Sequence, residues 1–279
     1  MDFWYKEAQT NDLLLGVRVT DILHSETTPY QRLAVVETVE YGKMLILDGA
    51  IQCTERDEFL YHEMIVHVPM HVHPNPKRVC VIGGGDGGSV REALKHSSVA
   101  KVKHVEIDGA VIEASKKYFP HLSSGFSDPR VDVLITDGIE YLKNCEPNCF
   151  DVIIIDSTDP VGPAVGLFSA EFYGYAYKAL TWDGVICAQT ESPFASANLL
   201  KKCWHNMKVH FPQVGVATGF MPTYPTGFWT YTVGSKKMAL KANREVTIRG
   251  KYFTKSLMER AFDLPPFLQE MLEGSKKNL

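Results

Sequence analysis

The chain has 279 residues, of which 45% are hydrophobic and 22% charged, and its formal net charge at pH 7 is −4. This composition is typical of globular proteins and excludes collagen, coiled coils and wholesale disorder. There is no basic excess for nucleic acid, and no apolar run approaches the roughly 20 residues of a membrane span. Because the six cysteines form no CxxC pair and the N-terminus lacks a signal-peptide pattern, we expect a cytoplasmic protein with reduced thiols.

The first 60 residues predict a small domain of antiparallel β-strands. Runs rich in Val, Thr and Leu over 32–39, 43–47 and 51–55 are separated by Tyr41-Gly42 and Asp48-Gly49. Asp-Gly between two apolar runs favours a type I′ hairpin, since both central residues of that turn have positive φ. A meander of this size is marginally stable alone, so we expect it to pack on the rest of the chain or on another subunit.

Beyond this meander, short apolar runs alternate with helical segments such as 109–118. The runs that we interpret as buried strands are 79–82, 103–107, 131–135, 150–155 and 184–189. Strands alternating with helices are typical of right-handed βαβ crossovers and a parallel sheet. The sequence therefore predicts an α/β fold, with a Rossmann-like catalytic domain over 61–279 and an antiparallel β domain over 1–60.

A glycine-rich turn follows the first strand of this region. Gly83, Gly85 and Gly88 have the G-x-G-x-x-G spacing, and Glu106 stands near the end of the next strand. Glycine lets the backbone turn sharply and approach a ligand, and an acid placed like Glu106 accepts hydrogen bonds from ribose hydroxyls. Turn and acid together predict a nucleoside site.

The turn also contains an acid, Asp86, which bears on the kind of nucleoside. A dinucleotide would place its pyrophosphate over the turn, where a carboxylate would repel it. The cation of an adenosyl sulfonium would instead be attracted. Asp86 therefore favours a ligand of the S-adenosylmethionine type, although a turn residue that only caps the next helix would look the same.

Three more acids follow later strands: Asp137, Asp156 and Asp159. The carboxyl ends of parallel strands share one edge of the sheet, so we expect these side chains to converge with Asp86 and Glu106. Like charges that converge in a buried place repel one another, and a dication or trication would relieve the repulsion. A metal ion is the rival explanation. We expect none, because the acids are spread over several loops and no close pair of acids has a neighbouring histidine.

Several longer stretches resemble one known family, the polyamine aminopropyltransferases, and within it the spermidine synthases. These stretches are LDGAIQCTERDEFLYHEMIVHVP (47–69), GGGDGGSVRE (83–92), VEID (105–108), DG (137–138), DSTDPVGPA (156–164), LF (167–168), EFY (171–173), AQTESP (188–193) and PTYPTGFWTYTVGSK (222–236). The resemblance covers essentially the whole chain. It implies a methyltransferase-type Rossmann-like sheet and a homodimer or homotetramer with subunit contacts through the N-terminal meander.

The resemblance also implies a reaction, the transfer of the aminopropyl group of decarboxylated S-adenosylmethionine to putrescine. The products are spermidine and 5′-methylthioadenosine, and neither a cofactor nor a metal is needed. It assigns one group of residues to the nucleoside: Gln31, Glu106, Asp137, Gly138 and Pro163. It assigns the following residues to the aminopropyl group and the polyamine: Tyr61, His62, Asp86, Asp159, Gln189 and Tyr224. Asp156 resembles the acid that accepts the proton of the attacking amine, and we place Trp229 in a core strand outside the site.

Three alternatives stay open. The acceptor is cadaverine, agmatine or spermidine instead of putrescine; or the enzyme is an S-adenosylmethionine-dependent amine methyltransferase; or the chain binds a nucleoside without catalysis. Asp86 disfavours the methyltransferase because it would repel the carboxylate of S-adenosylmethionine.

Overall fold

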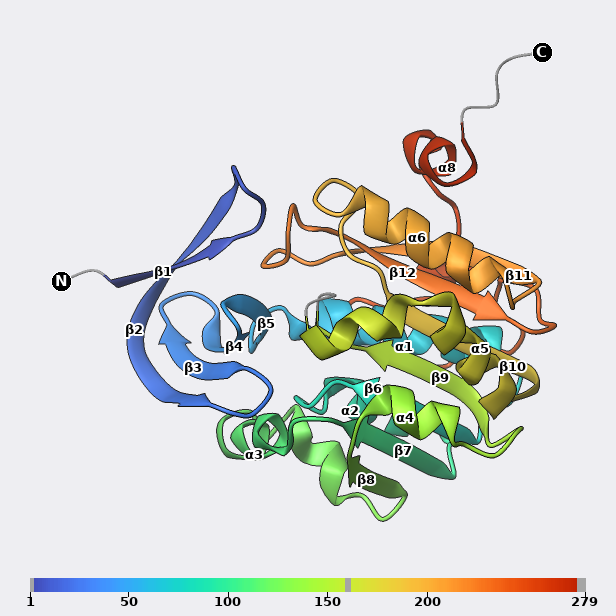
Figure 1. Ribbon diagram of the computed structural model, residues 1–279, viewed down its shortest axis with the longest axis horizontal. Helices are drawn as coiled ribbons and strands as arrows, with labels where there is room; N and C mark the ends of the chain where they lie inside the picture. Colours follow the sequence, from blue (N-terminus) through green and yellow to red (C-terminus); the bar gives the residue numbers. More distant parts are fainter. Residues whose placement is uncertain (1–2, 159–161, 275–279) are drawn as a thin grey trace.

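In the computed structural model, which describes residues 3–158 and 162–274, the chain forms two β-sheets that lie side by side (Figure 1). The first is an antiparallel sheet in the order β1-β2-β3-β4-β5. Its strands are β1 (Phe3–Ala8), β2 (Leu14–Thr27), β3 (Arg32–Thr38), β4 (Gly42–Leu47) and β5 (Ala50–Thr54). The predicted antiparallel meander is therefore confirmed, and it is longer than the sequence pattern indicated, since β1 was not predicted.

The turn between β4 and β5 has the predicted geometry. Asp48 has φ 48° and Gly49 has φ 91°, and Leu47 pairs with Ala50 across the two-residue loop. Positive φ at both central positions is the requirement of a type I′ turn. The local sequence therefore determines the register of this hairpin.

The second sheet has seven strands in the order β11-β12-β10-β9-β6-β7-β8. They are β6 (Arg78–Gly83), β7 (Lys101–Glu106), β8 (Val131–Ile135), β9 (Phe150–Asp156), β10 (Leu180–Gln189), β11 (Gln213–Phe220) and β12 (Phe228–Ser235). Strands β6 to β10 are parallel as predicted, but β12 runs antiparallel to both neighbours. The sheet is therefore mixed, because the connection from β11 to β12 is too short for a crossover helix.

Helices cover both faces of this sheet, which therefore borders two hydrophobic cores. The helices are α1 (Glu58–Val72), α2 (Gly88–Leu94), α3 (Gly109–Tyr118), α4 (Gly138–Lys143), α5 (Ala170–Ala179), α6 (Ala197–Lys208), α7 (Lys255–Glu259) and α8 (Pro266–Glu273). Along β6, Val79 and Val81 pack with α1, while Cys80 and Ile82 pack with α4 and α5. This alternation is the period of two expected for a strand buried on both faces.

A third core joins the two sheets. Leu33 and Leu45 of the antiparallel sheet pack against Val111 and Phe119, in and just after α3. The antiparallel sheet ends at Thr54 and α1 begins at Glu58, so the domain boundary predicted at residue 60 lies inside a helix.

The C-terminal segment crosses the outer side of α1 and is held there by a buried carboxylate. Glu63 of α1 accepts hydrogen bonds from the backbone N–H groups of Lys251, Tyr252 and Phe253, at 2.7–2.8 Å. A Cβ on Gly250 would lie 2.1 Å from Oε2 of Glu63, so only glycine fits there. The segment after β12 therefore fixes the helix that carries Tyr61 and His62.

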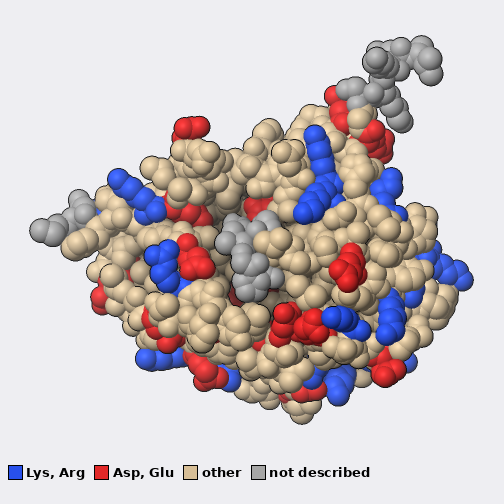
Figure 2. Space-filling view, viewed as in Figure 1, with Lys and Arg blue, Asp and Glu red and all other residues tan. Residues whose placement is uncertain are grey.

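Within the described residues no helix has the length and apolar character to cross a membrane. The six cysteines form no disulfide. On the face shown in Figure 2, basic side chains are scattered among acidic ones.

Candidate active site

A cleft lies between the antiparallel sheet and the carboxyl ends of β6, β7 and β9, where the α/β topology places ligands. Most of the predicted site residues line it: Gln31, Tyr61, Asp86, Glu106, Asp137, Gly138, Asp156, Gln189 and Tyr224. Asp159 lies outside the described residues. Pro163 belongs to a short 3₁₀ helix, Gly162–Phe168, and its side chain is likewise outside the described part of the chain.

The glycine turn after β6 brings its backbone against Asp156. Gly84 has φ +68°, and a Cβ there would lie 2.5 Å from Asp156 Oδ2. A side chain at this position would therefore displace the carboxylate as well as strain the backbone. Gly88 opens α2, and a Cβ there would lie 2.3 Å from the ring of His62. The two glycines thus make room for functional side chains.

Asp156 ends β9 and is held by two hydroxyl groups. Tyr61 Oη donates to Oδ1 at 2.7 Å, and Ser89 Oγ donates to Oδ2 at 2.6 Å. Burial raises the pKa of Asp156, and the charge of Asp86 raises it further. An acid in this setting accepts a proton more readily than an ordinary aspartate does.

The pKa of Asp86 is shifted in the opposite direction. Its Oδ1 accepts a hydrogen bond from the Gly88 N–H at 2.6 Å and lies 3.2 Å from Nε2 of His62. Burial opposes ionisation, but the adjacent imidazolium lowers the pKa of Asp86 below its usual value. The helix-capping reading of Asp86 is therefore compatible with a binding role, since the residue contacts the start of α2 and also lines the cleft.

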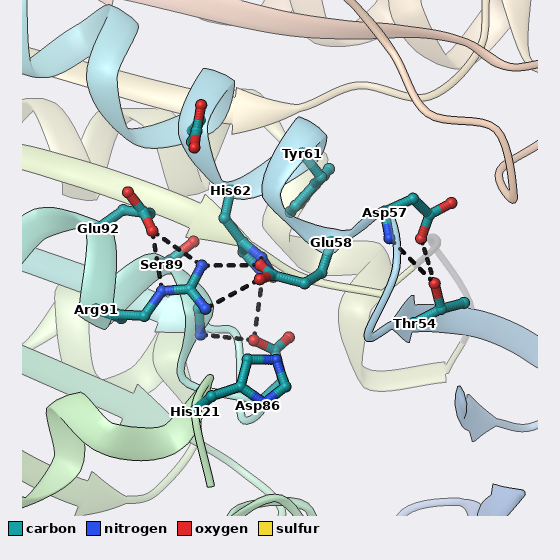
Figure 3. A network of polar contacts seen from close by, with 12 residues as sticks. Thr54, Asp57, Glu58, Tyr61, His62, Asp86, Ser89, Arg91, Glu92 and His121 are labelled. Atoms are coloured by element: carbon teal, nitrogen blue, oxygen red, sulfur yellow. Dashed lines mark hydrogen bonds and ion pairs between the residues drawn. The ribbon is translucent and has the colours of Figure 1, made fainter. Parts of the chain in front are cut away.

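His62 does not line the cleft, in contrast to its predicted contact with substrate. It is 1% exposed and lies behind Asp86 (Figure 3). Its Nδ1 is 2.7 Å from Glu58 Oε2, one helical turn earlier on α1. Burial opposes protonation, yet Asp86 and Glu58 on its two sides raise the pKa of His62 well above its usual value. His62 therefore acts on the cleft through Asp86.

At the end of the cleft predicted to bind the nucleoside, carboxylates are held mainly by backbone N–H groups. Glu106 accepts from the N–H of Asp108 at 2.9 Å, and burial raises the pKa of Glu106 to about 7. Asp108 caps α3 and accepts from Nε2 of Gln31 at 2.9 Å. Asp137 caps α4. The spacing of acids at strand ends thus predicted side chains that the fold brings together.

Aromatic side chains form one wall of the other end of the cleft. The ring of Tyr224 packs edge-on against Tyr61 and Trp229, with ring centroids 5.5 and 4.6 Å away. Trp229 lies in a core strand as predicted, but placing it outside the site was wrong, since it also lines the cleft. The difference arises because β12 begins at the cleft, so its early residues reach it. Gln189 donates to the carbonyl of Ser157 at 3.1 Å.

The sequence reasoning did not single out several residues of this site: Glu7, Glu58, Ser89, Arg91 and Gln52. Glu7 of β1 is 6% exposed, lines the cleft, and accepts from the N–H of Ile51 at 2.9 Å. Glu58 was recognisable as the residue one helical turn before His62. Gln52 comes from β5 and both Ser89 and Arg91 come from α2, so no local pattern linked them to the acids of the cleft.

The buried groups of the cleft do not form a metal cage. Within residues 3–158 and 162–274, no group of three or more His, Cys, Asp or Glu side chains is arranged to hold a metal ion. The acids of the cleft are instead spaced along it, with hydrogen-bond partners of their own.

Comparisons with known proteins agree with this anatomy. Residues 58–244 match the family model of the spermine/spermidine synthase domain, and residues 3–55 match that of the spermidine synthase tetramerisation domain. The chain is 49% identical over 277 residues to a polyamine aminopropyltransferase of Moorella thermoacetica, which covers 98% of each chain. It is 46% identical over 275 residues to one of Bacillus subtilis, covering 98% of this chain and 99% of that protein.

Solved structures give the same result. A crystal structure of spermidine synthase in complex with the transition-state analogue AdoDATO has a TM-score of 0.94 and 43% identity, covering 97% of this chain and 95% of that one. The spermidine synthase of Thermotoga maritima has a TM-score of 0.92 and 42% identity, covering 97% of this chain and 94% of that one. The chain therefore belongs to the spermine/spermidine synthase family, the polyamine aminopropyltransferases.

Proposed function

We propose that this aminopropyltransferase is a spermidine synthase, which transfers the aminopropyl group of decarboxylated S-adenosylmethionine to putrescine. The observation that carries the proposal is the pair of carboxylates Asp86 and Asp156, whose surroundings favour ionisation of the first and protonation of the second. One suits the binding of a cation and the other the acceptance of a proton. Pairs of acids set apart in this way mark complementary roles in catalysis.

In the proposed reaction, the amine of putrescine attacks the carbon next to the sulfonium. A C–N bond forms and the C–S bond breaks, so its electron pair goes to sulfur and 5′-methylthioadenosine leaves as a neutral thioether. The proton of the attacking amine passes to Asp156. Freeing an alkylamine of a proton at pH 7 costs roughly 4–5 kcal/mol. The raised pKa of Asp156 and repulsion from the sulfonium both reduce that cost.

The donor would lie along the cleft with its nucleoside between the two sheets. Glu106 would accept the ribose hydroxyls, and its neighbours at this end are Gln31, Asp137, Gly138 and Pro163. Asp86 and Asp159 would hold the ammonium of the aminopropyl group. The sulfonium itself activates the carbon, so we propose that the reaction needs no cofactor and no metal.

The acceptor would lie along the aromatic wall formed by Tyr61 and Tyr224, with Gln189 nearby. A diamine has a second ammonium beyond its reacting end. The buried carboxylate of Glu7, on the antiparallel sheet, also lines the cleft, and we assign that ammonium to it. Putrescine is an apolar four-carbon chain with an ammonium at each end, and an aromatic wall with carboxylates nearby suits this charge pattern.

The enzyme would also assemble from identical subunits. Phe3, Trp4, Leu14 and Ile22 on β1 and β2 are each more than half exposed. Apolar side chains gathered on one exposed sheet indicate a protein interface. We propose a homodimer or homotetramer formed through this sheet, and light scattering after size-exclusion chromatography would measure its mass.

The function is tested with a panel of acceptors and decarboxylated S-adenosylmethionine, by measuring release of 5′-methylthioadenosine. Putrescine is compared with cadaverine, agmatine and spermidine, and S-adenosylmethionine serves as the control donor. A strong preference for putrescine would support the proposal. Preference for another amine would retain the mechanism and change the acceptor, and turnover only with S-adenosylmethionine would indicate a methyltransferase. Binding of 5′-methylthioadenosine without turnover of any amine would indicate a nucleoside-binding protein.

A further inference from the structure

Behind the cleft, a row of buried side chains of alternating charge leads away from Asp86 (Figure 3). His62 bridges Asp86 and Glu58, with contacts of 3.2 and 2.7 Å. Both carboxylate oxygens of Glu58 accept from Arg91 of α2, at 3.0 Å from Nη1 and 2.8 Å from Nη2. Neither Glu58 nor Arg91 lines the cleft, so the proposed reaction leaves their geometry unexplained.

We propose that Glu58 and Arg91 are positioning residues of the donor site: they hold His62 as an imidazolium, which fixes the Asp86 carboxylate with Oδ2 free for the ammonium of the donor. The inference rests on the proposed function for the identity of that ammonium.

The carboxylates on the two sides of the ring favour this charge state of His62. A neutral imidazole has one N–H, whereas the imidazolium has two. Carboxylates lie on both sides of the His62 ring, and each is an acceptor when ionised. The ring therefore donates to both only when it is protonated. Within the described residues, His62 and the Gly88 N–H both meet Oδ1 of Asp86, so Oδ2 is the oxygen left for a ligand.

Arg91 keeps Glu58 ionised despite its burial. The side chain of Glu58 is 5% exposed, and a lone buried carboxylate would take up a proton. Burial opposes ionisation, but hydrogen bonds and charge from His62 and Arg91 lower the pKa of Glu58 to about 2. The carboxylate also lies in the first turn of α1, where the helix dipole favours negative charge. The charge on His62 thus depends on two residues that never meet the substrate.

Other ionisable groups surround the ring and enter any measurement of its titration. They are Glu58 on α1 itself, Asp86 and Asp156 at the cleft, and Tyr61, whose ring packs edge-on against His62 at 5.3 Å. Cys53, Arg91 and His121 interact with Glu58. Because Asp86 and Asp156 are near one another, loss of the imidazolium would leave their repulsion uncompensated.

The test combines the charge of His62 with the kinetics of Glu58→Gln and Arg91→Met. Enzyme labelled with ¹⁵N in its histidine rings reports the titration of His62, which is assigned by comparison with His62→Gln. We expect His62 to titrate at lower pH in both variants than in the unchanged enzyme. We also expect the KM for decarboxylated S-adenosylmethionine to rise about tenfold, the size expected when a charged hydrogen bond is lost.

Three comparisons separate positioning from a merely structural role. Binding of 5′-methylthioadenosine should be unchanged, because this product lacks the ammonium. Arg91→Lys should recover most of the donor affinity. Lys95→Met, at the residue that follows the last turn of α2, removes the same charge and also breaks an ion pair, with Glu92. It should leave the donor KM unchanged. Circular dichroism and thermal unfolding confirm that each variant folds, and the isosteric Glu58→Gln serves if Arg91→Met does not.

An unchanged His62 titration in both variants would overturn the inference. Equal losses of donor and 5′-methylthioadenosine affinity would overturn it too, since they would indicate a general disturbance of the cleft. If the unchanged enzyme used no aminopropyl donor, the proposed function would fail. The His62 titration would still decide whether Glu58 and Arg91 set the charge beside Asp86.

Discussion

At the nucleoside end of the cleft, Glu106, Asp108 and Asp137 each accept a hydrogen bond from the backbone N–H two residues later. At the amine end, Asp86 accepts a similar local hydrogen bond from the Gly88 N–H and also pairs with His62. Asp156 accepts hydrogen bonds from the hydroxyls of Tyr61 and Ser89. Acids fixed by their own backbone can be placed from local sequence. Acids fixed by distant side chains can be tuned separately, and these are the ones to which we assign the chemistry.

The largest effect that would test this difference is expected for Asp156→Asn. We expect kcat to fall by about 10³-fold, the range of a lost general base, with binding of 5′-methylthioadenosine unchanged. Kinetics over a range of pH provide the measurement. In the unchanged enzyme the rate should fall as the pH drops through the raised pKa of Asp156, because a protonated acid accepts no proton.

The fall in rate at low pH should be missing in Asp156→Asn. The difference in kcat between this variant and the unchanged enzyme should become smaller at alkaline pH, as more of the amine becomes free base. The matched control is Asp132→Asn, which changes an exposed aspartate paired with Lys103. Near-normal turnover in Asp156→Asn, with no effect of alkaline pH, would contradict the assigned role.

A smaller effect is expected at the far end of the acceptor site, where Glu7→Gln removes a buried negative charge. We expect the KM for putrescine to rise about 30-fold, equivalent to roughly 2 kcal/mol for a lost charge pair. The donor KM should not change. Steady-state kinetics with each substrate varied in turn measure the difference, and the exposed Glu40→Gln serves as the control. A rise in both KM values would show that Glu7 supports the whole cleft instead of the acceptor.

Three variants would then compare the amine end and the nucleoside end of the cleft directly. Asp86→Asn should raise the donor KM about tenfold through loss of one charged interaction, with 5′-methylthioadenosine still bound normally. Asp159→Asn should behave in the same way. Glu106→Gln should weaken binding of 5′-methylthioadenosine itself, measured by calorimetry. Similar effects of all three on the product would contradict the division of the cleft.

The last prediction concerns stability and compares two buried glutamates whose pKa values are shifted in opposite directions. The pKa of Glu106 is raised from 4.5 to about 7, so the folded state holds an extra proton between these values. The free energy of unfolding should therefore fall as the pH rises through this window, by up to about 3 kcal/mol. Glu58, whose pKa is lowered from 4.5 to about 2, should contribute stability that is lost only as the pH drops below its unfolded value.

Chemical denaturation at about pH 5 and pH 7 measures this contrast. Glu106→Gln should remove part of the decline between the two values, whereas Glu58→Gln should leave that decline in place. The same slope in Glu106→Gln as in the unchanged enzyme would show that this carboxylate is not the group responsible.

Much of the architecture was predictable because its signals are local. The Asp48-Gly49 turn requires a particular backbone, and short apolar runs between helical segments indicated β6 to β10. The run 131–135 was expected to be buried, but β8 is the edge strand and is largely exposed. β1 was missed because most of its residues are exposed, which leaves no clear alternation. The antiparallel direction of β12 was not predicted, because a short connection, not a residue pattern, determines it.

The same distinction applies to the site. Acids at strand ends were found from spacing, and Asp86 from its place in a glycine turn. Glu7 comes from β1, and Ser89 and Arg91 come from α2, and only tertiary packing brings Glu7 to the cleft and the other two against Asp156 and Glu58. The role of His62 behind Asp86 depends on a missing side chain at Gly88, which no pattern around His62 indicates.

The three backbone bonds to Glu63 have a practical consequence for anyone who handles this protein. The matched catalytic family domain ends at residue 244, so a shortened chain that stops there would appear to keep every catalytic residue. It would nevertheless remove the partners of a buried carboxylate next in sequence to His62. A minimal enzyme, or a fusion to a reporter, should therefore retain the C-terminal segment through at least Phe253.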